Sequence, residues 1–118
     1  MIKYFGIAAI FLCSACNSPD TAVPEDIISA EEMVPILVDI HLVEGSRNGA
    51  IILGDTNKIE DYYAKVYEKY GISDEYFKTS FAYYSGNPEV FIPIYKQVLD
   101  SLKAYGTVLS RQDVVKNR

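Results

Sequence analysis

Apolar residues recur at steps of three and four along most of this chain, which is the period of one face of an α-helix. Between the periodic segments stand short groups of glycine, serine, asparagine and proline, which are typical of turns. No segment shows the strict alternation of a half-buried β-strand. The pattern therefore predicts an all-α fold, a small bundle of about four helices over residues 28–110, followed by a polar C-terminal tail at residues 111–118.

The first helix is predicted to begin at Ser29, which stands three residues before Glu32 as in a capping box. Its apolar residues form two neighbouring stripes, so we expect this helix to be covered on more than one side. Gly45 and Gly49 weaken a helix, and we expect it to end or fray between them. The apolar run at residues 50–53 either extends this helix or crosses over it.

The second helix has the clearest pattern. From Ile59 to Tyr70, apolar and aromatic residues occupy one face and charged residues occupy the other. Gly71 follows, and glycine at this place favours a left-handed C-cap. Ser73 is then the expected N-cap of a third helix. The inner face of the third helix should carry Phe77, Ser80, Phe81 and Tyr84.

A fourth helix is predicted to begin at the pair Asn87 and Pro88, with the asparagine as its N-cap and the proline as its first residue. Apolar residues continue from there at helical spacing. The helix should end at Gly106, or one turn later if Leu109 carries it on.

The start of the chain has a different pattern. Lys3 precedes a short apolar run, which ends in the small residues Ser14 and Ala15 just before Cys16, and the chain then turns polar. A basic start, an apolar run too short to span a bilayer and small residues before a cleavage point predict a secretory signal. A cut before a cysteine resembles the lipobox of bacterial lipoproteins, although Cys13 stands where that motif usually has leucine.

We therefore expect a cleaved lipoprotein signal peptide at residues 1–15, a lipid on Cys16, and a flexible tether over residues 16–27. The lipid would hold the domain on a membrane of the cell envelope, with the outer membrane favoured over the inner one. An uncleaved N-terminal anchor and a conventional secretory signal remain as alternatives.

Composition narrows the range of partners and cross-links. The chain carries 16 acidic and 11 basic residues, for a net charge of −5. This balance disfavours binding to phosphate backbones, so we do not expect a nucleic-acid partner. Both cysteines lie in the signal region, which leaves none in the mature domain for a disulfide. Because tryptophan is absent, the tyrosines must supply much of the packing area.

His41 and Glu44 are the first candidates for chemistry. They stand three residues apart and share a helix face, a spacing that can hold a metal when other ligands converge. The chain has a single histidine, so we expect no metal and no cofactor. A hydrolase would also need an orienting acid and a nucleophile, for which the candidates are Asp39 and either Ser46 or Ser80. Asp39 and His41 are two residues apart and point away from each other on a helix, so we expect no catalytic residues.

The tyrosines are the most unusual feature of the sequence. We expect Tyr63, Tyr67 and Tyr95 to fill the edge of the core. Tyr83 and Tyr84 are adjacent before a helix break, so the two cannot both face inward with their neighbours, and we expect them at an exposed patch. The candidate binding patch consists of His41, Glu44, Tyr83, Tyr84 and Asn87.

Three ordered motifs make the chain resemble a known family. They are Asp39-x-His41-x-x-Glu44, the run Tyr67-Glu68-Lys69-Tyr70-Gly71-Ile72, and Tyr83-Tyr84-x-x-Asn87-Pro88. With the lipobox before them, they resemble the domain-of-unknown-function family 4296 of small bacterial lipoproteins. The resemblance covers roughly Pro24 to Leu102. It implies a helical, lipid-anchored envelope protein and brings no activity with it.

The residues and the resemblance together predict a non-enzymatic helical domain, anchored to the membrane through a lipid on Cys16. We expect it to bind or scaffold another protein of the cell envelope. Two alternatives belong to other classes. One is a small hydrolase or metal-dependent enzyme centred on His41 and Glu44, and the other is a tyrosine-lined module for a small ligand or a glycan.

Overall fold

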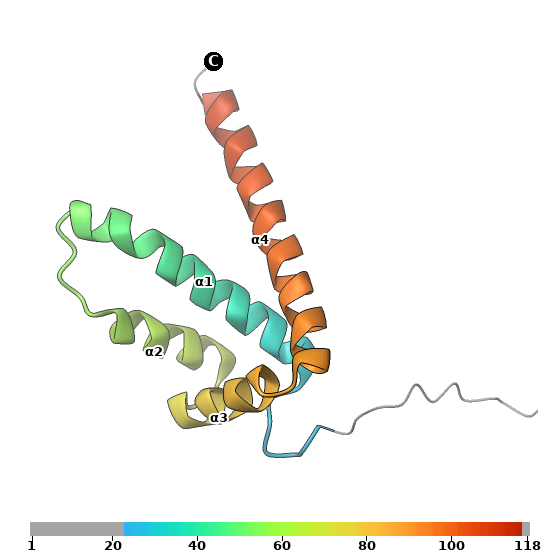
Figure 1. Cartoon of the computed structure of the whole chain (residues 1–118). Coiled ribbons are helices and arrows are strands. Elements are labelled where there is room, and N and C mark those ends of the chain that lie inside the picture. Colours follow the sequence, from blue (N-terminus) through green and yellow to red (C-terminus); the bar gives the residue numbers. More distant parts are fainter. Residues whose placement is uncertain (1–22, 117–118) are drawn as a thin grey trace, which may run out of the picture.

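The computed structural model describes residues 23–116. The expected signal peptide, the acceptor Cys16, most of the tether and the last two residues lie outside the described range. Within that range the chain is all-α, as predicted, and forms four helices in the order shown in Figure 1. They are α1 (Ala30–Ile52), α2 (Ile59–Tyr70), α3 (Asp74–Ser85) and α4 (Pro88–Lys116).

Two side-chain caps and one left-handed glycine explain three of the helix boundaries. The Ser29 hydroxyl accepts a hydrogen bond from the Glu32 amide at 3.3 Å, and Ser73 does the same for the amide of Tyr76 at 3.1 Å. Gly71 ends α2 with a φ of 64°, in the left-handed region that favours glycine. These boundaries confirm the predicted starts of α1 and α3 and the predicted end of α2.

The predicted end of the first helix is wrong. α1 runs through both Gly45 and Gly49 and reaches Ile52, so the apolar run extends the helix. A glycine inside a helix costs roughly 1 kcal/mol relative to alanine, which weakens a helix without ending it. The chain turns only at Gly54, where φ is 89°.

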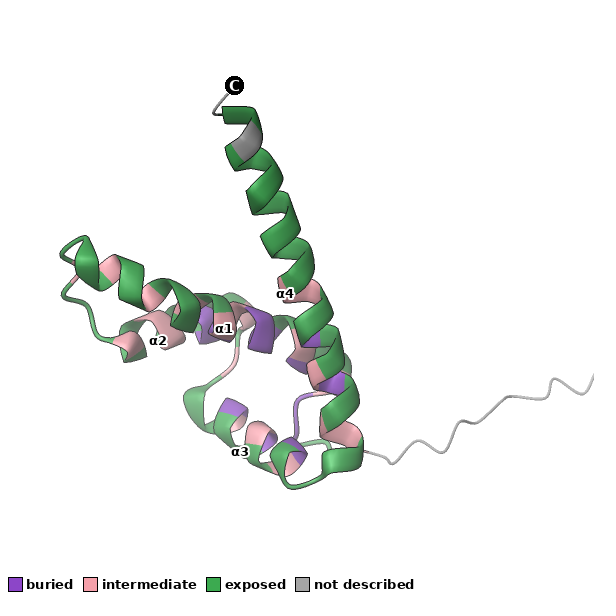
Figure 2. Ribbon diagram, turned by 45° about the horizontal axis from the view of Figure 1, so that its top comes forward, coloured by how far each residue is buried: buried purple, intermediate pink, exposed green. Residues whose placement is uncertain are grey.

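The end of the last helix also differs from expectation. α4 passes through Gly106 and Leu109 and continues to Lys116, so most of the segment expected to be a polar tail is helical. Its side chains from Lys103 to Asp113 are exposed. Figure 1 shows this half of α4 extending past the other helices, and Figure 2 shows it almost uniformly exposed.

The core forms around the first half of α1. This helix packs against both α2 and α4, whereas α3 packs against α2 and α4 only. No Cα atom of α1 lies within 8 Å of a Cα atom of α3. The most deeply buried of the large side chains are Ile28, Met33, Ile36, Tyr84, Ile94 and Val98.

The segment that leads into α1 is fixed to α3 by two buried hydrogen bonds. The Ile28 amide donates to the Ser80 hydroxyl at 2.9 Å, and the Tyr84 hydroxyl donates to the Ile28 carbonyl at 2.6 Å. Ser80 in turn donates to the Tyr76 carbonyl at 2.8 Å. Both backbone polar groups of Ile28 are therefore paired in the core, which is what burial away from water requires.

Among the described residues, none of the helices combines enough length with enough apolar character to span a membrane.

Candidate functional site

An open cleft of about 620 Å³ lies in the space between α1 and α3, with α2 and α4 at its sides. Its apolar lining comes from residues already packed in the core, among them Leu37 and Ile40 of α1, Tyr67 of α2 and Phe77 of α3. The cleft exists because α3 is held at a distance from α1 by its contacts with the other two helices. It is the natural candidate for a binding site, since ligand sites are concave and mostly apolar with a few polar groups.

A continuous series of aromatic contacts runs along this cleft, and all of its rings except that of Phe91 line it. Ring centroids are separated by 5.2 Å between Tyr67 and Phe77 and by 5.9 Å between Phe77 and Phe81. The series continues through Phe91 to Tyr95, whose ring meets the imidazole of His41 edge-on at 5.6 Å. We call these residues the aromatic collar: Tyr67, Phe77, Phe81, Phe91, Tyr95 and His41.

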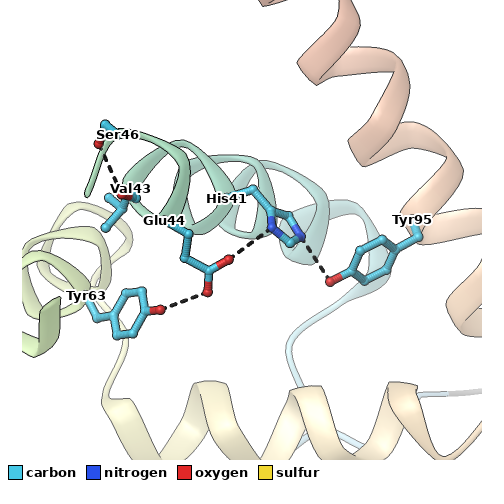
Figure 3. Close-up of polar contacts among 6 residues, drawn as sticks. All are labelled: His41, Val43, Glu44, Ser46, Tyr63 and Tyr95. Atoms are coloured by element: carbon cyan, nitrogen blue, oxygen red, sulfur yellow. Dashed lines mark hydrogen bonds and ion pairs between the residues drawn. The ribbon is translucent and has the colours of Figure 1, made fainter. Parts of the chain in front are cut away.

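A chain of hydrogen bonds completes the collar on its other side (Figure 3). His41 Nε2 lies 3.1 Å from the Tyr95 hydroxyl, and His41 Nδ1 lies 3.2 Å from Glu44 Oε2. The second carboxylate oxygen of Glu44 accepts a hydrogen bond from the Tyr63 hydroxyl at 2.8 Å. The four side chains come from α1, α2 and α4, so this polar chain joins three helices at the mouth of the cleft.

The chemistry of the partners assigns the protons in this chain. The Glu44 carboxylate can only accept, so His41 Nδ1 carries a proton and donates to it. In the neutral imidazole the other nitrogen, Nε2, is then an acceptor, and the Tyr95 hydroxyl donates to it. In this tautomer every proton of the chain is used.

Burial and the polar chain keep the tyrosine hydroxyls protonated. Burial, together with the hydrogen bond to Glu44, raises the pKa of Tyr63 to about 12. Burial likewise raises the pKa of Tyr95, to which the charge of Glu44 contributes. The pKa of Tyr67 is raised mainly by burial and also by the nearby Asp74. These three hydroxyls therefore stay neutral over the physiological range.

The mouth of the cleft is acidic. Besides Glu44, the carboxylates of Glu60 and Asp74 line it, against a single ammonium group from Lys78. Lys78 is itself paired with Asp74 at 2.7 Å. The acidic and lysine side chains that line the cleft carry a net charge of −2.

The structure divides the predicted binding patch. His41 and Glu44 lie at the cleft, but Tyr83, Tyr84 and Asn87 are not among its lining residues. Tyr84 is fully buried, which confirms its predicted place on the inner face of the third helix, and its predicted place in an exposed patch is wrong because its hydroxyl has a backbone partner in the core. The Asn87 side chain, expected to cap α4, donates instead to the Tyr83 carbonyl in the last turn of α3 at 2.6 Å.

For the aromatic residues of the cleft, the sequence predicts positions at the edge of the core or on the inner face of a helix. Tyr63, Tyr67 and Tyr95 do pack against the core, and the first two stand one turn apart on α2. Their second role at a cleft depends on the gap between α1 and α3. The hydrophobic pattern of a single helix does not predict that gap, because the gap depends on how the helices pack together.

The other candidates for chemistry are engaged elsewhere. Asp39 accepts hydrogen bonds from Lys69 at 2.6 Å and from Tyr70 at 2.8 Å, and so joins α1 to α2. Ser46 donates to the Val43 carbonyl at 3.1 Å (Figure 3). Within residues 23–116, no group of three or more histidine, cysteine or acidic side chains is arranged to hold a metal ion.

Comparisons with known proteins bear on the same region. A family model described as "Domain of unknown function (DUF4296)" matches residues 24–106. The matched range contains all the residues that line the cleft. No curated protein and no solved structure gives a significant match to the chain.

Proposed function

The chain belongs to the DUF4296 family, and for this member we propose a lipid-anchored binding domain of the cell envelope. In this proposal Cys16 carries the lipid, the tether gives the domain reach from the membrane, and the aromatic cleft holds a segment of another envelope protein. The domain performs no chemistry on what it binds, and it takes no cofactor.

The observation that carries the proposal is the aromatic collar along an open cleft. Packing alone would favour closing the gap between α1 and α3, because apolar surface left beside open space loses contacts that a filled core would make. Instead the collar and the polar chain hold the side chains around that gap in fixed positions. Sites arranged in this way bind with little loss of side-chain freedom, because their side chains are already ordered.

The surroundings of His41 support binding over catalysis. Both of its ring nitrogens are engaged, one with Glu44 and one with Tyr95. Ser80, one of the two candidate nucleophiles, is fully buried, and its hydroxyl accepts a hydrogen bond from the Ile28 amide. In this arrangement His41 connects α1 to α4.

Photocrosslinking in living cells tests the binding role of the cleft. A benzophenone analogue of phenylalanine would replace Phe81, which lines the cleft, in the full-length chain. The control places the same analogue at Thr107, on the exposed half of α4. We expect a crosslinked protein of defined mass from position 81 and none of that mass from position 107. Absence of any crosslinked species at position 81, or the same species from both positions, would refute the role of the cleft.

Metabolic labelling tests the anchor separately. Cells producing the wild-type chain or the Cys16→Ala variant would be fed an alkyne fatty acid, and the purified chains analysed by intact mass. We expect the wild type alone to carry the label, with an amino terminus at Cys16 and added acyl mass. A wild-type chain that still begins at Met1, or that lacks acyl mass, would show that the anchor is wrong.

A further inference from the structure

We propose that the cleft binds a positively charged side chain, an ammonium or guanidinium group on an apolar stem, presented by a partner polypeptide. This ligand class presupposes the binding role proposed above for the cleft. Three properties of the cleft lead to it: the free hydrogen-bond acceptors of its polar chain, the negative charge of its lining and its aromatic rings.

The polar chain of Tyr63, Glu44, His41 and Tyr95 can offer a ligand acceptors but no protons. The hydroxyl proton of Tyr63 is donated to Glu44, and in the neutral tautomer of His41 that of Tyr95 is donated to Nε2, which leaves both oxygens only lone pairs to offer. A carboxylate has about four lone-pair positions, and Glu44 uses two of them on Tyr63 and His41. The Glu44 side chain is 45% exposed, so its remaining positions are accessible. A ligand group that reaches this polar chain must therefore donate to it.

The charge of the lining selects a cationic donor over a neutral one. Glu44, Glu60 and Asp74 outweigh Lys78, and the ammonium of Lys78 already faces Asp74. This field attracts a cation and repels phosphate or carboxylate groups. The net charge of the whole chain, −5, acts in the same direction at long range.

The rings of the collar provide the second half of a cation site. Aromatic faces attract ammonium and guanidinium groups within about 6 Å, and several rings together form the aromatic cages that hold such groups. Phe81 and Tyr95 line the cleft from two helices and are only half-buried. A long aliphatic stem can lie on the apolar floor while the charged head reaches Glu44.

The size of the cleft indicates a polypeptide and not a free ion. A volume of about 620 Å³ exceeds the space that one basic side chain fills, and the cleft is open along one side. Ligand sites for drug-sized molecules span roughly 300–1,000 Å³, which corresponds to a short stretch of residues. Apolar neighbours of the basic residue would cover Phe77 and Phe81.

The experiment uses three capped tripeptides with leucine on both sides of arginine, citrulline or glutamate. Citrulline keeps the shape of arginine and removes its charge. Each peptide is titrated into the isotopically labelled domain, residues 17–118, and followed by amide chemical shifts. We expect residues of the cleft to shift with the arginine peptide, about tenfold weaker binding of the citrulline peptide, and no binding of the glutamate peptide.

Two substitutions locate the charge effect. Glu44→Gln keeps the size and one acceptor of the side chain, and we expect it to reduce the preference for arginine over citrulline to less than about threefold. Glu89→Gln, in the first turn of α4 and outside the cleft lining, is the matched control and should keep the full preference. Circular dichroism of both variants would confirm that they fold.

The outcomes separate this inference from the binding role. Equal binding of the arginine and citrulline peptides, or a preference that survives Glu44→Gln, would overturn the cationic ligand and leave the crosslinking result standing. Acetyl-arginine amide binding as tightly as the tripeptide would overturn the polypeptide ligand. Shifts confined to residues outside the cleft would overturn both parts of the proposal.

Discussion

Tyr84 and Ser80 satisfy the backbone of Ile28 from inside the core, and each does so with one hydroxyl group. Tyr84→Phe removes the donor to the Ile28 carbonyl while keeping the ring. A buried carbonyl left without a partner costs about 1–3 kcal/mol. We expect the free energy of unfolding to fall by that amount, as measured by urea denaturation at pH 7.

Tyr105→Phe is the control for this prediction, because it removes the same hydroxyl from a tyrosine that is half exposed to water. It should change the free energy of unfolding by less than about 0.5 kcal/mol. Equal effects of the two substitutions would show that the hydrogen bond from Tyr84 contributes nothing specific.

The Tyr63 hydroxyl makes stability depend on alkaline pH. Its pKa is about 12 in the folded chain and about 10 in the unfolded chain, so between these values the folded state keeps a proton that the unfolded state has lost. This contribution is complete below pH 10 and is lost as the pH rises toward 12. Urea unfolding at a series of pH values from 9 to 11.5 measures how steeply the free energy of unfolding falls with pH. Tyr63→Phe should make that slope shallower, by an amount that corresponds to the release of up to about one proton on unfolding. An unchanged slope would contradict the assignment.

The identity of the site residues was only partly visible in the sequence. The spacing of His41 and Glu44 placed both on one helix face, and the structure brings them into contact. Which of Tyr83 and Tyr84 is buried was harder to predict. Neighbouring residues on a helix differ by about 100° in direction, so either one could have faced inward. Their assignment depends on Ile28, more than fifty positions away in sequence.

At the scale of the elements, alanine substitutions at two glycines with different backbone conformations should change stability in opposite directions. Gly71 ends α2 with a positive φ, where a side chain is strained, so Gly71→Ala should destabilise the fold by about 1–2 kcal/mol. Gly45 lies inside α1, and an added Cβ there meets no atom within 4 Å. Gly45→Ala should therefore stabilise the fold by about 0.5–1 kcal/mol. Thermal unfolding of the pair measures both signs, and shifts in the same direction would contradict the argument.

Helix boundaries set by a local hydrogen bond or a left-handed glycine were predictable from the sequence. Ser29, Gly71 and Ser73 act through groups within a few residues of themselves. The ends of α1 and α4 were misjudged because a glycine with helical φ and a glycine with positive φ are identical in sequence. Only the conformation of Gly54 distinguishes it from Gly45 and Gly49.

At the scale of the whole molecule, the exposed half of α4 should be dispensable for folding. From Lys103 to Asp113 its side chains are exposed to water. A chain ending at Ala104 should lose less than about 0.5 kcal/mol of stability and keep the amide spectrum of the cleft residues. Urea denaturation of the truncated and full-length domains measures the difference, and a loss of more than about 1 kcal/mol would mean that this half packs against the body.

The cleft is a property of the assembled molecule. Each of the four helices contributes lining residues to it, and the amphipathic pattern of each helix is explained equally well by a closed core. The all-α class followed from periodicity, which is local. The distance between α1 and α3 followed from how both helices pack against α2 and α4, which periodicity does not report.

The buried attachment of Ile28 has a mechanical consequence. A pulling force applied at the amino-terminal side of the domain reaches this residue before it reaches α1. Its amide and its carbonyl are both bonded to α3, so the two bonds bear the load together and α1 cannot unwind turn by turn. A force applied at Lys116 meets the end of an exposed helix, which can unravel progressively. In single-molecule pulling between the two ends of the domain, the exposed half of α4 should therefore unravel before the bonds of Ile28 break.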